Sequence, residues 1–330
     1  MPDRCVSSAG GQHISSQTGR VRMVSSVPPF PKDGAVESRS VQPPRTAHLP
    51  ASTGGAVIIP AHNEAGVIAR TLGALAPLVA IEGIEVIVVC NGCTDGTAEI
   101  ASAFAGVRVL ETTEPSKTAA LNLGDETATA WPRLYLDGDI EIDPQAVLAV
   151  FGALAQPGAL AARARYVYDV TGASLPVRAY HRARSRIAAP PKRLWGAGGY
   201  AINERGHARF ARFPDVVADD SWFDQQFDED EKQVVPTAPM RVRTPKTAAE
   251  LIAVLSRRRR GYLELEIQPA GAARARALLS SVRGPRTAFD AAWYAFVTLA
   301  ARRRAQRTMR QGGHQWERDA SSRTSRGGPA

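Results

Sequence analysis

Hydrophobic and polar positions alternate in blocks along residues 56–136, and the blocks have the lengths of strands and helices. Short β-branched runs such as Val57-Ile58-Ile59 are long enough for a buried strand and too short for a helix. Between these runs, apolar residues recur at helical spacing, as at Val67, Ile68 and Leu72. We predict strands at 57–59, 84–89, 107–110 and 133–136, and helices at 64–76, 94–104 and 116–128. This alternation predicts an α/β fold with a mostly parallel central sheet and flanking helices.

Polar loops follow three of the predicted strands, at residues 60–64, 91–97 and 137–139. In open parallel sheets, ligands bind at the carboxyl ends of the strands. All three loops follow apolar strands, so the sequence predicts one ligand site at this edge of the sheet.

Two carboxylates separated by one glycine follow the strand at 133–136. Asp137 and Asp139 can turn toward one hard cation, and Mg²⁺ prefers carboxylate, water and phosphate oxygens. The alternative is a β-turn, which favours Asp and Gly for conformational reasons alone. The strand context and the neighbouring polar loops favour the metal site.

The three cysteines are too few for a disulfide framework, which fits a reducing cytoplasm. Cys90 and Cys93 form a C-x₂-C pair, but a structural zinc site needs two further ligands, so packing is the favoured interpretation. No apolar run approaches the roughly 20 residues of a membrane span, and residues 1–25 lack the apolar segment of a secretory signal. We therefore expect a cytoplasmic protein.

The net charge of +9 is unevenly distributed along the chain. Residues 241–330 contain 19 Lys and Arg against 6 Asp and Glu, a charge of +13, whereas residues 1–240 carry −4. This basic region predicts contact with an anionic surface, and the alternative is a solvated arginine-rich surface. Residues 287–300 are rich in aromatics and precede three arginines, which is typical of a helix at a membrane surface. A helix that packs on the rest of the protein is the slightly preferred alternative.

The composition divides the chain into four segments. Residues 1–53 are rich in Ser and Pro and are expected to be a disordered leader. Residues 54–240 are expected to form the catalytic domain, residues 241–310 a basic helical region, and residues 311–330 a polar tail.

Four motifs in sequence resemble those of family 2 glycosyltransferases. They are VIIPAHNE at 57–64, VVCNGCTDGT at 88–97, KTAALN at 117–122 and LDGD at 136–139. Their order and spacing match, and the resemblance covers about residues 55–240. It implies a GT-A fold, the Rossmann-like fold of nucleotide-diphospho-sugar transferases. It also implies a nucleotide-sugar donor such as a UDP- or GDP-sugar, Mg²⁺ or Mn²⁺, and transfer with inversion at the anomeric carbon.

The resemblance also implies roles for single residues. It places the donor beside Pro60, Ala61, Glu64, Asn91, Lys117, Asp137 and Gly138, and the metal at Asp139 and Asp137. Asn91 stands where the family often has an acidic residue that contacts the base or ribose. Gly198 and Gly199, in GAGGYAI at 196–202, resemble the acceptor-side segment, and a simple glycine-rich connection is an equal alternative.

Asp219 and Asp220 resemble the acidic pair whose second member removes the proton of the acceptor hydroxyl. An inverting displacement needs a base on the face opposite the leaving diphosphate, so we predict Asp220 as the base and Asp219 as its neighbour. The alternative is a solvated acidic face, because residues 219–231 contain seven acidic residues.

Four arginines at 257–260 follow a helical pattern, while the Q-x-x-R-W motif of processive family members is missing from the sequence. One of these arginines is a candidate for the donor diphosphate, and a solvated helix end is the alternative. We therefore predict a non-processive hexosyltransferase acting on a hydroxyl acceptor, which a lipid can carry. Such an enzyme would act in cell-envelope, polysaccharide, glycolipid or secondary-metabolite glycosylation.

Two other functions compete with this prediction. A nucleotidyltransferase on a similar fold would need a glycine-rich loop with a basic residue after the first strand, and residues 60–64 do not supply it. A nucleic-acid-binding protein acting through the basic region would need a recognisable binding module with interleaved aromatic and basic residues. The sequence shows none, so no nucleic-acid partner is expected.

Overall fold

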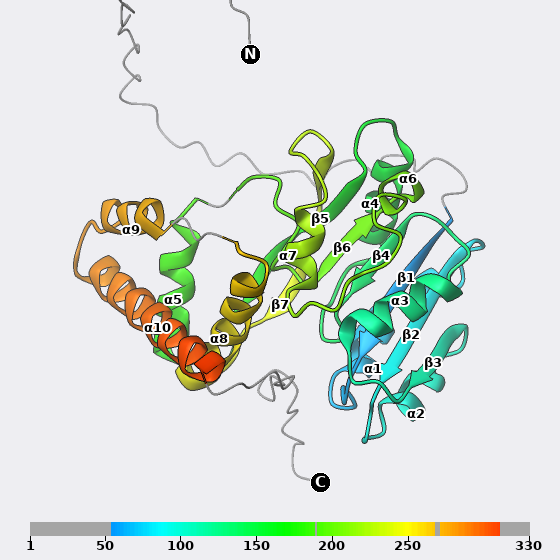
Figure 1. Ribbon diagram of the computed structural model, residues 1–330, viewed down its shortest axis with the longest axis horizontal. Coiled ribbons are helices and arrows are strands. Elements are labelled where there is room, and N and C mark those ends of the chain that lie inside the picture. Colours follow the sequence, from blue (N-terminus) through cyan, green and yellow to red (C-terminus); the bar gives the residue numbers. More distant parts are fainter. Residues whose placement is uncertain (1–53, 189, 268–270, 311–330) are drawn as a thin grey trace, which may run out of the picture. The chain divides into compact units, whose positions relative to one another are not determined.

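The computed structural model describes residues 54–188, 190–267 and 271–310. The predicted leader at 1–53 and the predicted tail at 311–330 lie outside these ranges. Within them, seven strands form one sheet in the order β3-β2-β1-β4-β6-β5-β7 (Figure 1). The strands are β1 Gly55–Ala61, β2 Ile84–Asn91, β3 Val107–Thr112, β4 Arg133–Leu136, β5 Ala161–Asp169, β6 Gly199–Ile202 and β7 Lys232–Arg243.

The sheet is mostly parallel, as the alternation of strands and helices predicted. β1 pairs in parallel with β2 and β4, and β2 pairs in parallel with β3. β6 runs antiparallel to both β4 and β5, and β5 pairs in parallel with β7. The carboxyl ends of β1, β2 and β4 therefore meet at one edge, where the polar loops follow.

Ten helices accompany these strands in the described ranges. They are α1 Ile68–Val79, α2 Thr97–Ser102, α3 Lys117–Thr127, α4 Pro144–Ala155, α5 Leu175–Ser185, α6 Glu204–His207, α7 Asp219–Asp224, α8 Ala248–Glu264, α9 Gly271–Ser280 and α10 Pro285–Arg310. The strands and helices predicted between residues 56 and 136 are all present. α1 begins at Ile68 rather than at residue 64, because the Glu64 carbonyl first closes a turn by accepting from Val67 and Ile68.

Side chains of β1 alternate between two apolar cores, one on each face of the sheet. Val57 and Ile59 pack in a cluster with residues of α1 and α4, such as Leu72 and Phe151. Ile58 points the other way and packs in a cluster with Leu121 of α3. The continuous apolar run of β1 thus reflects burial on both faces, which is typical of parallel sheets.

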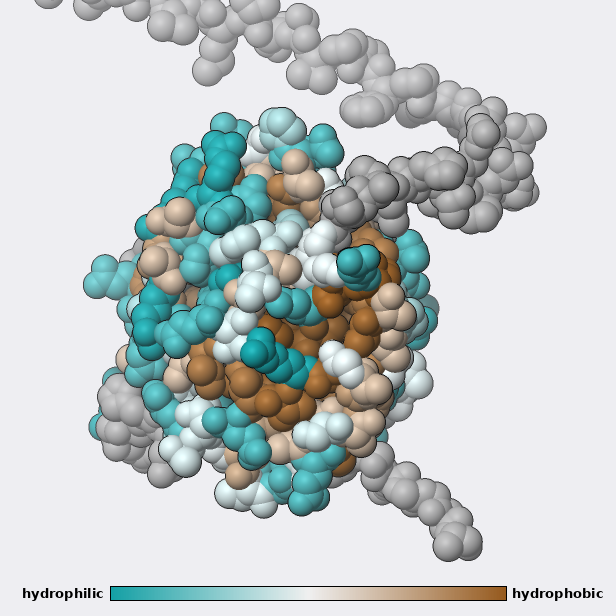
Figure 2. All heavy atoms as spheres, turned by 90° about the vertical axis from the view of Figure 1, so that its right-hand side faces the viewer, coloured by the Kyte–Doolittle hydropathy of each residue, from teal (hydrophilic) through white to brown (hydrophobic). Residues whose placement is uncertain are grey.

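The β3 edge of the sheet lies on the face that Figure 2 turns toward the viewer, and hydrophobic residues gather at the centre of this face. β3 is the end strand of the sheet order, and Val107 and Val109 are half-buried there. The side of the sheet formed by β3 is a different surface from the one at the carboxyl ends of the strands, where the polar loops lie.

Helices α5, α8 and α10 pack together as a helical layer beside β5 and β7 (Figure 1). Val177, Tyr180, Leu251 and Val297 form its core. The helix predicted at 287–300 thus packs on the rest of the protein through one face, and β7 runs through the predicted boundary at residue 240. None of the helices in the described ranges combines the length and the apolar character needed to cross a membrane.

Asp290 joins α10 to α5 through two ion pairs. Its carboxylate is 1% exposed and accepts from Arg182 Nη2 at 2.6 Å and from Arg186 Nη1 at 3.0 Å. Burial raises the pKa of Asp290, but the hydrogen bonds from the two arginines outweigh this effect and hold the pKa below its ordinary value. The charged form of Asp290 is therefore part of the packing between these helices.

We predict that Asp290→Asn lowers the free energy of unfolding by up to roughly 3 kcal/mol. Removing one member of a fully buried ion pair costs about 3–5 kcal/mol, and the partial exposure of both arginines places this pair at or below the lower limit. The lowered pKa makes this stabilisation present above the ordinary aspartate pKa of about 3.9 and lost as the pH falls through the folded-state value. Urea unfolding at pH 7 and at pH 3 measures both effects. The control is Glu126→Gln, because Glu126 forms an exposed pair with Arg212, which is worth about 0–1 kcal/mol. Equal losses in the two variants would contradict the prediction.

Candidate functional site

A cleft of about 280 Å³ lies at the carboxyl ends of β1, β2 and β4, and residues of α5, α7 and α8 complete its lining. The structure brings most of the predicted site residues together there. The predicted residues that line the cleft are Pro60, Glu64, Asn91, Lys117, Asp137, Gly138, Asp139, Gly198, Asp219 and Asp220. Ala61 and Gly199 are buried within β1 and β6 instead.

Hydrogen bonds hold the loops after β1 and β2 against each other. Asn63 Oδ1 accepts from the Thr94 N–H at 2.6 Å, and the Glu64 N–H donates to Thr97 Oγ1 at 2.7 Å. Asn63 has a φ of 52°, in the left-handed region that Asn tolerates better than most residues. These contacts fix the two polar loops as one wall of the cleft.

Asn91 is the last residue of β2, and its side chain is 1% exposed. Neither its Oδ1 nor its Nδ2 has a hydrogen-bond partner in the part of the chain that the structure describes. A buried polar group left unsatisfied costs about 1–3 kcal/mol. The amide offers one acceptor and a donor group to a ligand in the cleft.

Lys117 bridges two carboxylates from different parts of the site. Its Nζ lies 2.7 Å from Asp137 Oδ1 and 2.9 Å from Asp219 Oδ2. Burial lowers the pKa of Lys117, but the charges of Asp137 and Asp219 outweigh burial and raise the pKa above its usual value. Lys117 therefore stays protonated and ties the loop after β4 to the start of α7. The helix α3 that presents it begins at a Ser116 cap, whose Oγ accepts from the Ala119 N–H at 3.2 Å.

The neighbours Asp219 and Asp220 have different surroundings. Asp219 is 4% exposed, and its Oδ2 accepts from Tyr200 Oη at 2.7 Å in addition to Lys117. Asp220 Oδ2 accepts from the Gly196 N–H at 2.6 Å. Burial and then the charge of Asp219 raise the pKa of Asp220. Asp219 is thus held by a cation and a phenol, while Asp220 has the increased proton affinity that a general base needs.

Gly198 lies against the loop after β4. Its φ is +69°, and a Cβ there would lie 2.6 Å from Ile140 Cγ1 and 3.1 Å from Asp137 Oδ2. Its carbonyl accepts from the Asp137 N–H at 2.8 Å. A larger residue at this position would displace the loop that carries Asp137.

The carboxylates of the cleft fit a divalent ion for which the chain would supply only some of the ligands. Asp137 and Asp139 both line the cleft. Across the described ranges there is no cluster of three or more His, Cys, Asp or Glu side chains placed to hold an ion. Mg²⁺ is commonly bound through one or two carboxylates, with waters and substrate phosphates as the remaining ligands. Asp139 and Asp137 match that pattern.

The cleft also contains residues that the motifs did not indicate. They are Tyr168 of β5, Tyr180, His181 and Arg184 of α5, and Arg243 of β7. The sequence indicates only that His181 and Arg184, three residues apart, lie on the same face of a helix. Burial and the charges of Arg184 and Arg258 lower the pKa of His181 to about 4, so its ring is neutral near pH 7.

The four arginines at 257–260 lie inside α8 rather than at a solvated helix end. Arg257 and Arg258 line the cleft, and Arg260 is buried. Arg258 lies close enough to Asp220 for their charges to interact.

Cys90 is buried and Cys93 is partly buried, and both are free thiols. Burial and then the neighbouring Cys93 raise the pKa of Cys90 to about 12. The Cys93 thiol donates to the Ala61 carbonyl at 3.4 Å. This environment agrees with packing cysteines; Cys5 lies outside the described residues.

Comparison with known proteins identifies the class of this site. Residues 56–207 match the family model for glycosyl transferase family 2. The chain therefore contains a family 2 glycosyltransferase domain with a GT-A fold, and the protein is a glycosyltransferase, as the motifs predicted. No curated protein matches the sequence significantly.

Three solved structures are similar to this chain. The mannosyltransferase PcManGT from Pyrobaculum calidifontis, in complex with GDP-Man and Mn²⁺, has 20% identity and a TM-score of 0.50, covering 78% of this chain and 76% of that one. S. aureus TarS in complex with UDP-GlcNAc has 13% identity and a TM-score of 0.46, covering 79% and 92%. Glucosyl-3-phosphoglycerate synthase from Mycobacterium tuberculosis in complex with UDP has 22% identity and a TM-score of 0.46, covering 66% and 82%. The nucleotidyltransferase and nucleic-acid alternatives are not favoured.

We predict that Asp139→Asn weakens Mn²⁺-dependent binding of UDP or GDP by more than about tenfold, or about 1.4 kcal/mol. The fold should be unaffected, because Asp139 lies in a loop of the cleft and not in the core. Calorimetry with and without Mn²⁺ measures the affinity, and the melting temperature checks the fold. Asp215→Asn is the control, since Asp215 is exposed and is not part of the cleft lining. Unchanged Mn²⁺-dependent affinity in Asp139→Asn would remove this residue from the metal site.

Proposed function

We propose that this protein is a non-processive, inverting glycosyltransferase that uses a nucleotide-diphosphate sugar, a divalent metal ion and a hydroxyl acceptor. One observation carries the proposal. A carboxylate with a raised pKa, Asp220, lies in the same cleft as the Asp137 and Asp139 carboxylates, and Lys117 pairs with both Asp137 and Asp219. This arrangement provides a base close to a metal and diphosphate site.

The donor nucleotide is proposed to lie against Pro60, Glu64 and Asn91 at the ends of β1 and β2. The unsatisfied amide of Asn91 supports this position, because a base or ribose would provide its missing hydrogen bonds. Asp137 and Gly138 lie at the diphosphate side of the same cleft, with Ala61 supporting the loop from inside β1. The similar mannosyltransferase was solved with GDP-Man and Mn²⁺, which supports a donor and metal of this kind.

The transfer step is proposed to use Asp220 and the residues around it in the cleft. Asp220 takes the proton of the acceptor hydroxyl, whose oxygen attacks the anomeric carbon from the face opposite the diphosphate, and the bond to the diphosphate breaks. A divalent ion held at Asp139 and Asp137 supplies neutralisation of the charge that grows on the leaving diphosphate. Arg257 of α8 is a candidate to assist there, and Gly198, which lines the cleft, is proposed to lie on the acceptor side. Asp219 orients its neighbour through Lys117 and Tyr200.

Asp220→Asn tests the function directly. The change keeps the size of the side chain but removes its ability to accept a proton, so turnover should fall by about 10² to 10⁴ while donor affinity survives. Because the pKa of Asp220 is raised, the acid limb of the wild-type pH profile should lie above the ordinary aspartate value of about 3.9. Release of UDP or GDP from the sugar donor measures turnover, and calorimetry measures donor affinity. Near-normal turnover in Asp220→Asn would mean that the base lies elsewhere, with Asp219→Asn as the next variant.

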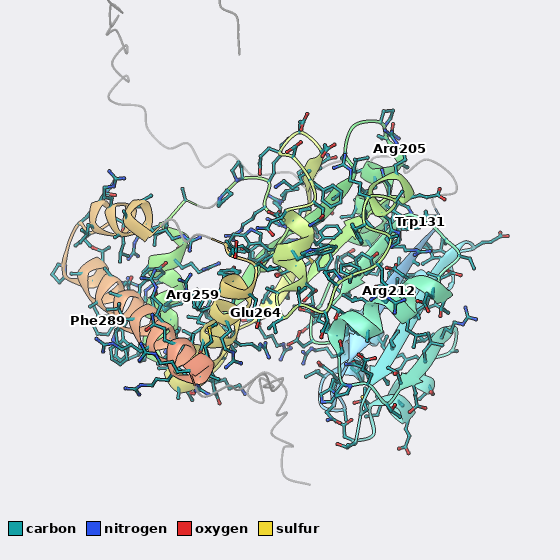
Figure 3. All side chains as sticks on the ribbon, in the orientation of Figure 1. Trp131, Arg205, Arg212, Arg259, Glu264 and Phe289 are labelled. Carbon is teal, nitrogen blue, oxygen red and sulfur yellow. The ribbon has the colours of Figure 1, made fainter. Side chains whose placement is uncertain are left out.

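A second proposal concerns the membrane. We propose that α10 contacts an anionic membrane surface, where a lipid-linked hydroxyl acceptor would be available. Phe289, labelled in Figure 3, and Phe296 are 48% and 56% exposed. Arg303 and Arg307 are exposed at helical spacing from them. Aromatic side chains suit the acyl boundary, and arginines suit anionic headgroups.

The membrane proposal predicts that the protein sediments with phosphatidylglycerol vesicles at low salt and is released as salt rises, through screening of the arginines. Phe289→Ser combined with Phe296→Ser should weaken sedimentation, while Ile81→Ser, a partly exposed apolar residue beyond the end of α1, should not. Failure to bind anionic vesicles at low ionic strength would leave packing on the protein as the function of α10.

A further inference from the structure

A second cavity, of about 210 Å³, lies in the helical layer next to the cleft. Its lining comes from α5, α7, α8, α9 and α10, and four aromatic side chains contribute to the walls: Tyr180, Trp195, Tyr262 and Tyr294. For scale, an apolar cavity of about 150 Å³ can hold benzene. No motif of the sequence marks this cavity, and neither the proposed donor site nor the metal site uses it.

The cavity has a large excess of positive charge. Five arginines line it, namely Arg184, Arg258, Arg259, Arg274 and Arg302, against the single carboxylate of Asp224. Asp224 already accepts from the Leu194 N–H at 2.7 Å and lies 3.5 Å from Lys232 Nζ. Among the residues that the structure describes, no carboxylate forms an ion pair with any of the five guanidinium groups. We call this cavity the arginine pocket.

The arginines affect one another because they are close together and partly buried. Burial and then the charge of Arg302 lower the pKa of Arg259. Arg259 lies in the helical layer in Figure 3, away from the labelled Trp131 and Arg212 beside the parallel strands. Arg258 has Asp220 nearby, but Arg259 and Arg302 have no carboxylate partner among the described residues, and a bound anion would offset the cost of their partial burial.

The arginine pocket adjoins the catalytic cleft on the acceptor side. Tyr180, Arg184, Leu255 and Arg258 line both cavities. Arg258 lies at the junction, where its charge interacts with that of Asp220. Gly196 leaves room for it, since a Cβ there would lie 3.1 Å from Arg258 Nη2. A ligand in the arginine pocket would therefore lie next to the part of the cleft that contains the proposed base.

We propose that the arginine pocket binds the anionic part of a small acceptor, a molecule that carries a phosphate or carboxylate group in addition to the reacting hydroxyl. Guanidinium groups bind both anions through paired hydrogen bonds. The aromatic walls accommodate the carbon skeleton. The inference rests on the proposed function, because the reacting hydroxyl is the one whose proton passes to Asp220 while the nucleoside diphosphate leaves the sugar.

Matched pairs of probes test this inference by calorimetry. The pairs are glycerol 3-phosphate with glycerol, and 4-hydroxybenzoate with 4-hydroxybenzyl alcohol, so that phosphate and carboxylate are tested separately. Each is titrated in the presence of saturating UDP or GDP with Mn²⁺, which occupies the donor site and prevents the anion from binding there. An anionic probe should bind the wild type at least about tenfold more tightly than its neutral partner.

The variants Arg259→Gln and Arg302→Gln localise the binding, because both residues line the arginine pocket and neither lines the cleft. Each should weaken the anionic probe by about tenfold or more, without changing the affinity for the neutral partner or for the nucleotide. Arg307→Gln is the matched control, since Arg307 is exposed on the same helix as Arg302. Melting temperatures confirm that each variant is folded, and two independent variants guard against the loss of one.

The outcomes separate this inference from the proposed function. Binding of anionic probes that depends on Arg259 and Arg302 supports the inference. If UDP or GDP binds with Mn²⁺ but no anionic probe binds more tightly than its neutral partner, the inference fails and the proposed function stands. If anions bind equally well to Arg259→Gln and Arg307→Gln, the inference also fails. If neither nucleotide binds, the proposed function fails, and the acceptor role of the pocket fails with it.

Discussion

The ion pairs of Lys117 with Asp137 and Asp219 are the interaction on which the rest of the site depends. One ammonium group pairs with two carboxylates, of which Asp219 is buried and Asp137 is partly exposed, and a buried carboxylate is costly without a partner. The pair at Asp137 fixes the loop after β4, and the pair at Asp219 fixes the start of α7. Burial and then the charge of Asp219 raise the pKa of Asp220. By holding Asp219 in place, Lys117 keeps this charge beside Asp220.

The basic residues of the C-terminal region lie in two different environments in the structure. Part of the basic C-terminal region faces inward, where Arg257 and Arg258 line the cleft and Arg302 lines the arginine pocket. Another part, including Arg303 and Arg307, is exposed on α10. Asp137 and Asp139 follow the carboxyl end of β4, while Asp219 and Asp220 begin α7. The cleft therefore contains carboxylates suited to a metal ion as well as arginines suited to an anion.

Helix α10 has features of both structures that its sequence allows, a helix packed on the protein and a helix at a membrane surface. One face is buried against α5 and α8 through Val297 and Asp290, which explains why the helix is part of the fold. The opposite face exposes Phe289 and Phe296. A sequence rich in aromatics and arginines contains both patterns at once, and only the packing shows which residues belong to each face.

The sequence by itself determined the parallel sheet and the meeting of polar residues at the carboxyl ends of its strands. The strands are short apolar runs, and polar residues such as Asp137 and Asn91 follow them directly, so their meeting at one edge follows from local pattern and strand direction. Tertiary structure alone decided which side chains of the helical layer join the cleft. Arg184 and Arg258 come from helices far apart in the chain, and neither follows a strand end. Their place in the cleft lining, and the approach of Arg258 to Asp220, depend on how α5, α8 and α10 pack, a long-range arrangement that no local pattern of residues encodes.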